Sequence, residues 1–167
     1  ERKFPISKIK LLASSRSAGK KMKFRGEDVV VEELTHDSFK GVDIALFSAG
    51  GSISKEFRQS VVDAGAIMID NSSAFRMDDD VPLVVPEVNP EDVKNHKGVI
   101  ANPNCSTIIM LVAVAPLHKA FGLKRLVAST YQATSGAGAK GMEEMLVQTR
   151  QVLNDEPIAP NVFAHRI

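Results

Sequence analysis

Residues 42–70 read VDIALFSAGGSISKEFRQSVVDAGAIMID and alternate between two apolar runs and one helical pattern. The apolar runs at 42–48 and 66–70 have the length of buried strands, and the stretch 52–64 between them has the periodicity of an amphipathic helix that ends at Gly65. A strand, a crossover helix and a second strand predict parallel pairing. Strands that are apolar nearly throughout also predict burial on both faces of the sheet.

The same alternation continues on both sides of this unit. Further apolar runs predict strands at 9–13, 22–24, 29–31, 99–101 and 123–131, and periodic patterns predict helices at 106–121 and 139–153. The chain is therefore expected to have an α/β fold built on a parallel sheet.

The composition of the 167 residues, with 44% hydrophobic and 25% charged residues, is typical of a soluble globular protein. Its net charge of +1 gives no reason to expect nucleic-acid binding, and its longest apolar run, Ile108–Pro116, is too short to cross a membrane.

A single cysteine, Cys105, excludes an internal disulfide and indicates a reducing compartment. The four histidines lack the spacing of a helical metal site, so no metal is expected.

Ligands of open α/β sheets bind at the carboxyl ends of the strands, so the residues that follow each strand are the candidates for a site. After the strand at 9–13 come Arg16 and Ser17, with no acid nearby. An arginine among hydroxyl side chains suits the 2′-phosphate of NADP, although a polar surface turn is the simpler interpretation.

Two further strand ends carry candidate anion sites. Ala49, Gly50 and Gly51 allow close backbone approach at a helix N-terminus, although a plain strand-to-helix turn explains them equally well. Arg76 ends the polar stretch that follows the strand at 66–70 and could hold a phosphate or carboxylate, although a surface arginine on a capped loop is the more common case.

Cys105 follows the strand at 99–101 and lies at the predicted N-terminus of a helix. The positive end of a helix stabilises a thiolate and favours a nucleophile, whereas most lone cysteines are small buried hydrophobes. The polar neighbours Asn104 and Ser106 favour the nucleophile. Gly136, Gly138 and Gly141 match G-x-G-x-x-G, but a lone match is weak and it comes late in the chain, so we do not interpret it as the main pyrophosphate site.

Five segments resemble the aspartate-semialdehyde dehydrogenase family in order and spacing across almost the whole chain. They are LFSAGG (46–51), DNSSAFR (70–76), VVPEVN (84–89), NPNCST (102–107) and the stretch from Ser129 to Gly138. The resemblance implies an enzyme that interconverts L-aspartate 4-semialdehyde and 4-phospho-L-aspartate with NADP and phosphate, on the route to lysine, methionine and threonine.

The resemblance also implies roles for individual residues. Cys105 matches the family's nucleophile, Gln132 its active-site glutamine, Arg76 its phosphate-binding arginine and Asn104 a substrate or phosphate contact. Cofactor contacts match seven further positions: Arg16, Ser17, the turn Ala49, Gly50 and Gly51, and Ser135 with Gly136. His165 and Arg166 fall in a different stretch from the family's catalytic histidine and substrate-binding arginine and receive no role.

The resemblance further implies a Rossmann-like doubly wound parallel sheet that is incomplete, because the family's first strand and glycine-rich turn have no match here. Residues 1–104 would form the NADP-binding domain, and residues 105–167 would begin an α+β catalytic and dimerisation domain. The parent enzyme is expected to be a cytoplasmic (or, in a plant, plastid) homodimer or homotetramer. This chain alone is expected to be inactive and poorly stable.

Two other functions remain open at this point. An N-acetyl-glutamyl-phosphate reductase-like enzyme would share the thioester chemistry and NADP, although the Tyr131–Gln132 and Phe75–Arg76 segments favour the aspartate enzyme. A non-catalytic NADP-binding fragment, with a structural Cys105, would show no unusual thiol reactivity.

Overall fold

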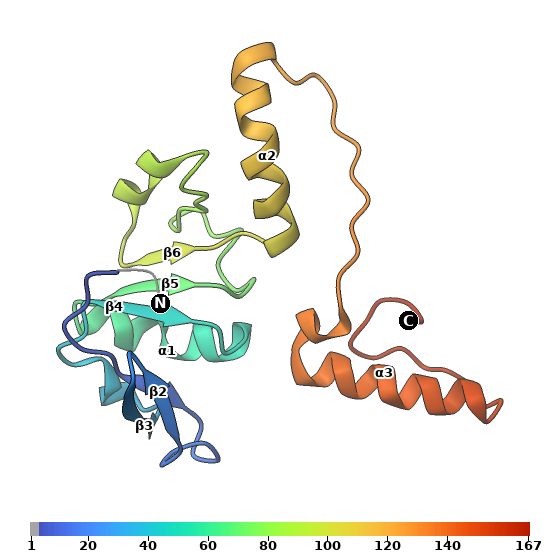
Figure 1. The fold of residues 1–167 in the computed structure, drawn as a ribbon, viewed down its shortest axis with the longest axis horizontal. Helices are drawn as coiled ribbons and strands as arrows, with labels where there is room; N and C mark the ends of the chain where they lie inside the picture. Colours follow the sequence, from blue (N-terminus) through green and yellow to red (C-terminus); the bar gives the residue numbers. More distant parts are fainter. Residues whose placement is uncertain (1–3) are drawn as a thin grey trace. The chain divides into compact units, whose positions relative to one another are not determined.

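A computed structural model describes residues 4–167 and divides into two compact units (Figure 1). The first unit holds the chain up to Leu83 together with Asp92–Asn102, and the second holds Val84–Glu91 and Pro103–Ile167. The domain boundary expected after Asn104 stays a prediction.

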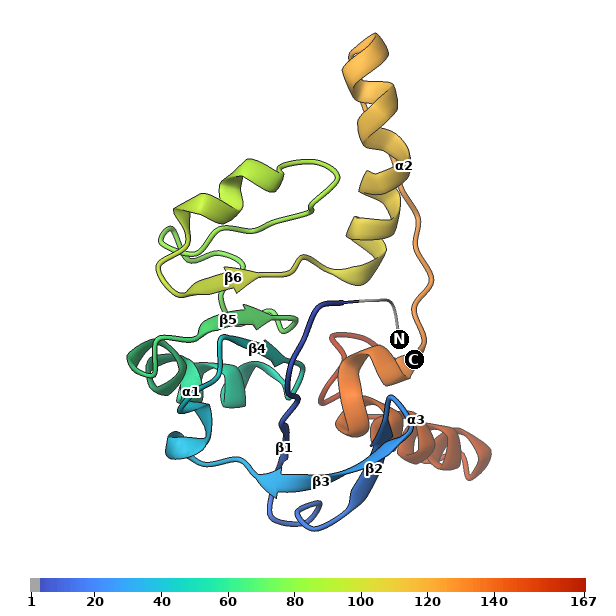
Figure 2. The ribbon, with the colours of Figure 1, turned by 60° about the vertical axis from the view of Figure 1, so that its left-hand side comes forward.

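The first unit contains a parallel sheet of three strands in the order β4 (Ile44–Phe47), β5 (Ile67–Asp70), β6 (Val99–Ala101). Helix α1 (Gly51–Asp63) makes the crossover from β4 to β5 and packs on the sheet, as Figures 1 and 2 show. In the register, Phe47 pairs with Asp70, and Asp70 pairs with Ala101. The carboxyl ends of the three strands therefore lie together, and the predicted strand–helix–strand unit is confirmed.

A second sheet has the order β1 (Leu11–Ala13), β3 (Glu27–Glu33), β2 (Lys21–Phe24). Strand β1 is parallel to β3, and β2 forms an antiparallel hairpin with β3. The strands of this unit thus belong to two sheets rather than one continuous sheet. Among the described residues, β1 pairs only with β3 and β4 pairs only with β5, so each leaves one edge unpaired.

The core of the first unit lies between α1 and the β4-β5-β6 sheet. Phe47 of β4, Phe57 and Val61 of α1, and Met68 of β5 are all buried, and Phe39 from the short 3-10 helix η1 (His36–Phe39) stacks on Phe47. A second 3-10 helix, η2 (Pro90–Asn95), precedes β6 and contributes no buried residue.

The expected burial of β4 on both faces was wrong. Ala45 and Phe47 are buried beneath α1, whereas Ile44 and Leu46 on the opposite face are 45% and 78% exposed. The covered face belongs to the buried cluster that contains Phe57 and Val61 of α1. Strand β4 therefore has two apolar side chains, Ile44 and Leu46, that this chain does not bury.

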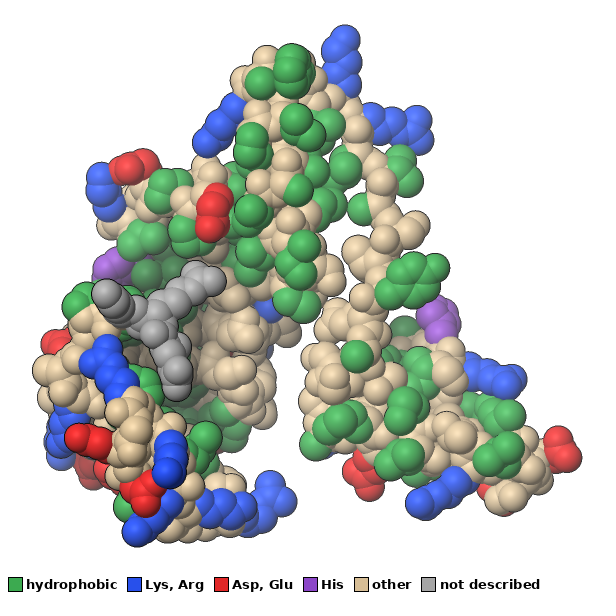
Figure 3. Space-filling model, viewed as in Figure 1, with side chains coloured by type: hydrophobic (Ala, Val, Ile, Leu, Met, Phe, Trp, Pro, Cys, Tyr) green, Lys and Arg blue, Asp and Glu red, His purple; other side chains and the backbone are tan. Residues whose placement is uncertain are grey.

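The second unit contains helix α2 (Cys105–Phe121), the 3-10 helix η3 (Thr134–Ala137) and helix α3 (Gly138–Leu153). The strand predicted at 123–131 is absent, because no described segment hydrogen-bonds to it as a sheet partner. Its apolar side chains are largely exposed: Val127 is 78% and Tyr131 100% exposed. Figure 3 likewise shows hydrophobic side chains at the surface of α2, where Ile109 and Phe121 are 74% and 84% exposed.

The C-terminal segment is held to α3 by two buried polar side chains. The Glu144 carboxylate accepts hydrogen bonds from the backbone N–H groups of Asn161 and Val162, and Gln148 accepts one from Ile167. Gln148 also donates to Glu144 over 2.8 Å. The N–H of Asn161 is the leading cause that lowers the pKa of Glu144 below its ordinary value, and the N–H of Val162 acts in the same direction.

Replacing Met68 by alanine is expected to lower the free energy of unfolding by about 2–5 kcal/mol, because its fully buried side chain would leave a cavity. Denaturant titration measures the loss. Met77→Ala is the matched control, since Met77 is 91% exposed. Equal losses in the two variants would contradict the core assignment.

Glu144→Gln is expected to release the segment 161–167 from α3 at neutral pH, since a neutral amide is a weaker acceptor for the backbone N–H groups. Because the pKa of Glu144 is lowered on folding, its contribution is present above the ordinary titration range of a glutamate, around pH 4, and is lost as pH falls through the lowered value. Hydrogen exchange at Asn161 and Val162 measures this. The exposed neighbour Glu143→Gln should leave that exchange unchanged.

Candidate active site

The carboxyl ends of β4, β5 and β6 are tied together by hydrogen bonds beyond the strand ladder. The N–H of Asn71 donates to Phe47 O over 2.9 Å, and the N–H of Asn102 donates to Asp70 O over 2.8 Å. The side chains of Asn71 and Asn102 are joined by a 2.7 Å hydrogen bond from Nδ2 of Asn102. These contacts fix the loops that carry the candidate residues of the first unit.

Arg76 lies at the end of the loop after β5 and reaches across the strand ends. Its Nε donates to Asn102 O over 2.9 Å, and its Nη2 donates to Asn71 O over 3.2 Å. The neighbouring Phe75 is buried and anchors the loop. A guanidinium has five N–H donors, so the two bonds to backbone carbonyls orient Arg76 and leave other donors for an anion.

The turn Ala49, Gly50 and Gly51 leads from β4 into α1. Gly50 has a φ of 94°, which favours glycine, and it caps α1 without a side-chain hydrogen bond. The first amides of α1 therefore lack a side-chain acceptor, as an anion site at a helix N-terminus requires. A Cβ built on Gly51 would lie 3.7 Å from Ala74 Cβ, so this turn and the Arg76 loop lie close together.

Arg16 and Ser17 lie in the turn after β1. Arg16 is exposed, and Ser17 is partly buried with its N–H bonded to Ser14 O over 2.9 Å. Of the candidates in the first unit, the structure brings the Gly51 turn and the Arg76 loop together, whereas Arg16 is exposed on its own turn.

In the second unit, Cys105 is the first residue of α2 and is exposed. Asn104 is the N-cap: its Oδ1 accepts from the N–H groups of Ser106 and Thr107 over 3.0 and 3.3 Å. The cap places the thiol at the positive end of a helix and in reach of solvent. The alternative of a small buried cysteine does not fit this exposure.

Gln132 and Gly136 lie against one another in the segment before α3. A Cβ on Gly136 would fall 1.9 Å from Nε2 of Gln132, so the side chain of the glutamine rests on the glycine backbone. Ser135, which lies between Gln132 and Gly136 in the sequence, is exposed in η3.

The other two glycines of the late G-x-G-x-x-G motif have structural roles. Gly138 begins α3 with a φ of 76°. A Cβ on Gly141 would lie 2.8 Å from Thr134 O and 3.1 Å from Phe163, so this position needs a glycine for packing. Each glycine thus has a local reason for its presence that does not involve a pyrophosphate.

Sequence reasoning did not single out the side chain of Asp70 or its two serine partners. The Asp70 carboxylate is fully buried and accepts 2.6 Å hydrogen bonds from the hydroxyls of Ser54 and Ser72. An acid directly at the end of an apolar strand was the available signal. The serines were not recognisable, because their approach depends on the fold.

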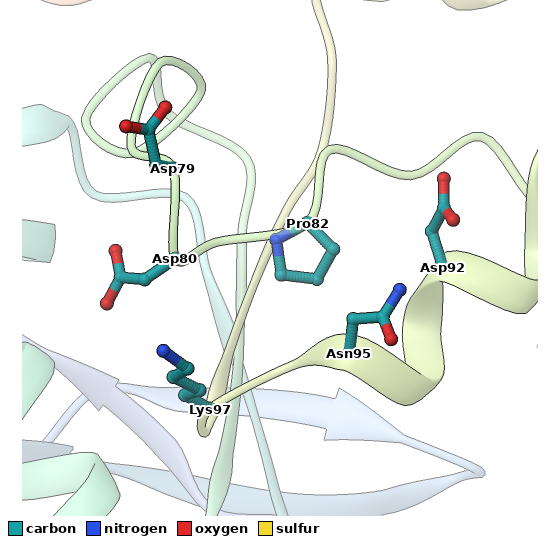
Figure 4. Close-up of a pocket in the computed structure, with 6 residues that line it drawn as sticks. All are labelled: Asp79, Asp80, Pro82, Asp92, Asn95 and Lys97. Atoms are coloured by element: carbon teal, nitrogen blue, oxygen red, sulfur yellow. The ribbon is translucent and has the colours of Figure 1, made fainter.

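A cavity of about 260 Å³ lies away from these residues. It is lined by Asp79, Asp80, Pro82, Asp92, Asn95 and Lys97, as Figure 4 shows. Within residues 4–167 no group of three or more His, Cys, Asp or Glu side chains is arranged to hold a metal ion. In the same range no helix has both the length and the apolar character needed to cross a bilayer.

These features define an α/β unit of the dinucleotide-binding class and a second unit that carries a cysteine at a helix N-terminus. Family profiles agree: residues 1–96 match "semialdehyde dehydrogenase, NAD binding domain" and residues 114–167 match "semialdehyde dehydrogenase, dimerisation domain". The chain belongs to the semialdehyde dehydrogenase family.

Individual relatives narrow the resemblance. The chain is 51% identical to the aspartate-semialdehyde dehydrogenase of Synechocystis and 52% identical to that of Bacillus subtilis, over 98% of its own length in both cases. It covers 51% and 47% of those proteins, so the chain spans about half the length of the curated relatives it matches. The resemblance to aspartate-semialdehyde dehydrogenases is therefore confirmed.

Solved structures agree with the fold. Aspartate semialdehyde dehydrogenase II of Vibrio cholerae, complexed with ASA, matches 99% of this chain and 50% of its own chain with a TM-score of 0.82 and 46% identity. The Candida albicans enzyme, solved with NADP, matches 68% of this chain and 40% of its own with a TM-score of 0.58 and 30% identity.

Asn104→Ala is expected to destabilise α2 by about 1 kcal/mol, because the cap of two backbone amides is lost. Denaturant titration followed by circular dichroism measures this. Asn104→Ser keeps a capping oxygen and should retain most of the stability. A serine variant as unstable as the alanine variant would show that the cap is not the cause.

Proposed function

We propose that this chain is part of an NADP-dependent aspartate-semialdehyde dehydrogenase that acts through a thioester on Cys105. The observation that carries the proposal is the exposed Cys105 at the capped N-terminus of α2, in a chain about half identical to enzymes of that name. The proposed reaction interconverts L-aspartate 4-semialdehyde and 4-phospho-L-aspartate, on the route to lysine, methionine and threonine.

In the oxidative direction the Cys105 thiolate attacks the aldehyde carbon, and a thiohemiacetal forms. Loss of its hydride leaves a thioester, which phosphate attacks at the acyl carbon to release the thiolate and the acyl phosphate. The covalent step divides one difficult conversion into two easier ones. NADP, when bound, supplies the hydride acceptor.

We propose roles for Arg76, Asn104 and Gln132 from the hydrogen-bond donors that each side chain offers. Arg76 orients phosphate with the guanidinium N–H groups that its two backbone bonds leave free. Asn104 keeps its Nδ2 available for substrate or phosphate while Oδ1 caps α2. Gln132, held against Gly136, contacts the substrate at Cys105.

The residues proposed to hold NADP fit an anionic dinucleotide. The turn Ala49, Gly50 and Gly51 offers backbone amides at the start of α1, and Ser135 with Gly136 gives a second backbone contact. Exposed Arg16, beside Ser17 in a turn (14–19) that contains no acid, suits the 2′-phosphate and favours NADP over NAD.

The parent protein is proposed to supply the remaining parts. The unpaired edges of β1 and β4, and the exposed Ile44 and Leu46, support a further strand and helix as the family's first βα unit. The exposed apolar residues of α2 and the segment 123–131 support the rest of a catalytic and dimerisation domain. We propose a cytoplasmic homodimer or homotetramer, or a plastid enzyme if the source is a plant.

The test is NADP-coupled, phosphate-dependent oxidation of aspartate semialdehyde by the full-length protein. Cys105→Ala is expected to lower turnover by roughly 10⁴-fold or more, the scale seen when a covalent nucleophile is removed. NADP binding by the variant, measured by titration, is the control for folding. The 167-residue chain, assayed alongside, should be inactive.

Two outcomes would refute the assignment. A folded parent that binds NADP but does not oxidise aspartate semialdehyde would direct attention to an N-acetyl-glutamyl-phosphate reductase-like activity. Full activity in Cys105→Ala would refute the thioester and leave a non-catalytic role for this cysteine.

A further inference from the structure

We infer that Asp70 is a positioning residue that couples the dinucleotide turn before α1 to the anion-binding loop that ends at Arg76. The inference rests on the proposed function, because it assigns NADP to the first of these segments and phosphate to the second. Asp70 itself touches neither ligand: it is fully buried at the end of β5.

The coupling runs through a continuous chain of hydrogen bonds. Ser54, fully buried in α1, donates its hydroxyl to Oδ1 of Asp70 over 2.6 Å, and its backbone N–H donates to Gly50 O over 3.1 Å. Ser72 donates to Oδ2 of Asp70 over 2.6 Å and accepts from the N–H of Ala74 over 3.1 Å. One carboxylate thus joins the Gly50 turn to the loop that carries Arg76.

The distances identify these bonds as strong ones. O–H···O bonds of 2.6 Å have the length of charge-assisted hydrogen bonds to a carboxylate. A buried carboxylate is costly unless both oxygens are satisfied, so loss of either serine hydroxyl leaves an acceptor without a partner. We therefore expect the order of the Gly50 turn to depend on that of the Arg76 loop, and the reverse, and the two segments also lie close together at Gly51 and Ala74.

This arrangement has a consequence for binding. A dinucleotide that orders the Gly50 turn fixes Ser54 and Asp70, and thereby Ser72 and the Arg76 loop. Phosphate then binds a loop that is already ordered and loses less conformational entropy. Such coupling is reciprocal, so phosphate must tighten dinucleotide binding by the same factor.

The first experiment titrates the full-length protein with NADPH, followed by its fluorescence, with and without saturating inorganic phosphate. Phosphate is expected to tighten NADPH binding by about 5-fold or more in the unaltered protein, within the usual range of coupling between sites. Asp70→Asn, which keeps the size of the side chain, is expected to reduce that factor to less than about twofold. Ser54→Ala and Ser72→Ala should do the same if Asp70→Asn fails to fold.

Matched controls come from the neighbouring exposed serines. Ser52 and Ser73 lie next to the segments in question but are exposed, so Ser52→Ala and Ser73→Ala should keep the coupling factor. Hydrogen exchange gives a readout without ligands. Ser72→Ala should speed exchange of the amides at 51–54, and Ser54→Ala should speed exchange at 74–76, whereas the controls should do neither.

The outcomes separate this inference from the proposed function. If NADPH and phosphate both bind but the coupling factor is the same in Asp70→Asn, or is absent in the unaltered protein, the inference fails and the proposed function stands. If the unaltered protein binds no NADPH, the proposed function and the inference both fail. Exchange effects confined to the mutated segment would also overturn the coupling.

Discussion

The main-chain hydrogen bonds between β4, β5 and β6 place the carboxyl ends of three parallel strands side by side, and every candidate residue from Ala49 to Arg76 depends on that placement. Each strand ends where its chain turns into a polar loop. The loops are then joined through Asn71, Asn102 and the guanidinium of Arg76. A cluster of polar groups that the sequence spreads over some 50 positions is thereby assembled at one edge of a sheet.

The same region shows two uses of polar side chains. Arg76 donates to the backbone carbonyls of Asn71 and Asn102 and keeps other N–H donors available, which is compatible with the anion-binding role proposed for it. Asp70, by contrast, is buried with both oxygens satisfied by serine hydroxyls, so its charge serves internal order rather than ligand binding. The difference between the two depends on where the side chain lies: Asp70 is buried at the end of β5, whereas Arg76 lies on the loop that follows the strand.

The three glycines of the G-x-G-x-x-G match at 136–141 have separate structural explanations. Gly136 makes room for Gln132, Gly138 adopts a positive φ at the start of α3, and Gly141 admits Phe163. The spacing alone would also have suited a nucleotide loop. The absence of a side chain is required at Gly141, where the backbone oxygen of Thr134 lies close, and backbone freedom is required at Gly138.

The sequence by itself determined the α/β class, the strand–helix–strand unit of 42–70 and the position of Cys105 at a helix start, because apolar periodicity and capping are local properties. It also carried the family resemblance. Only the tertiary structure decided that the strands divide into two sheets, that one face of β4 stays exposed and that 123–131 forms no strand, since pairing and burial depend on neighbours distant in sequence. The Ser54–Asp70–Ser72 network likewise required the fold, because 16 positions separate Ser54 from the acid that it contacts.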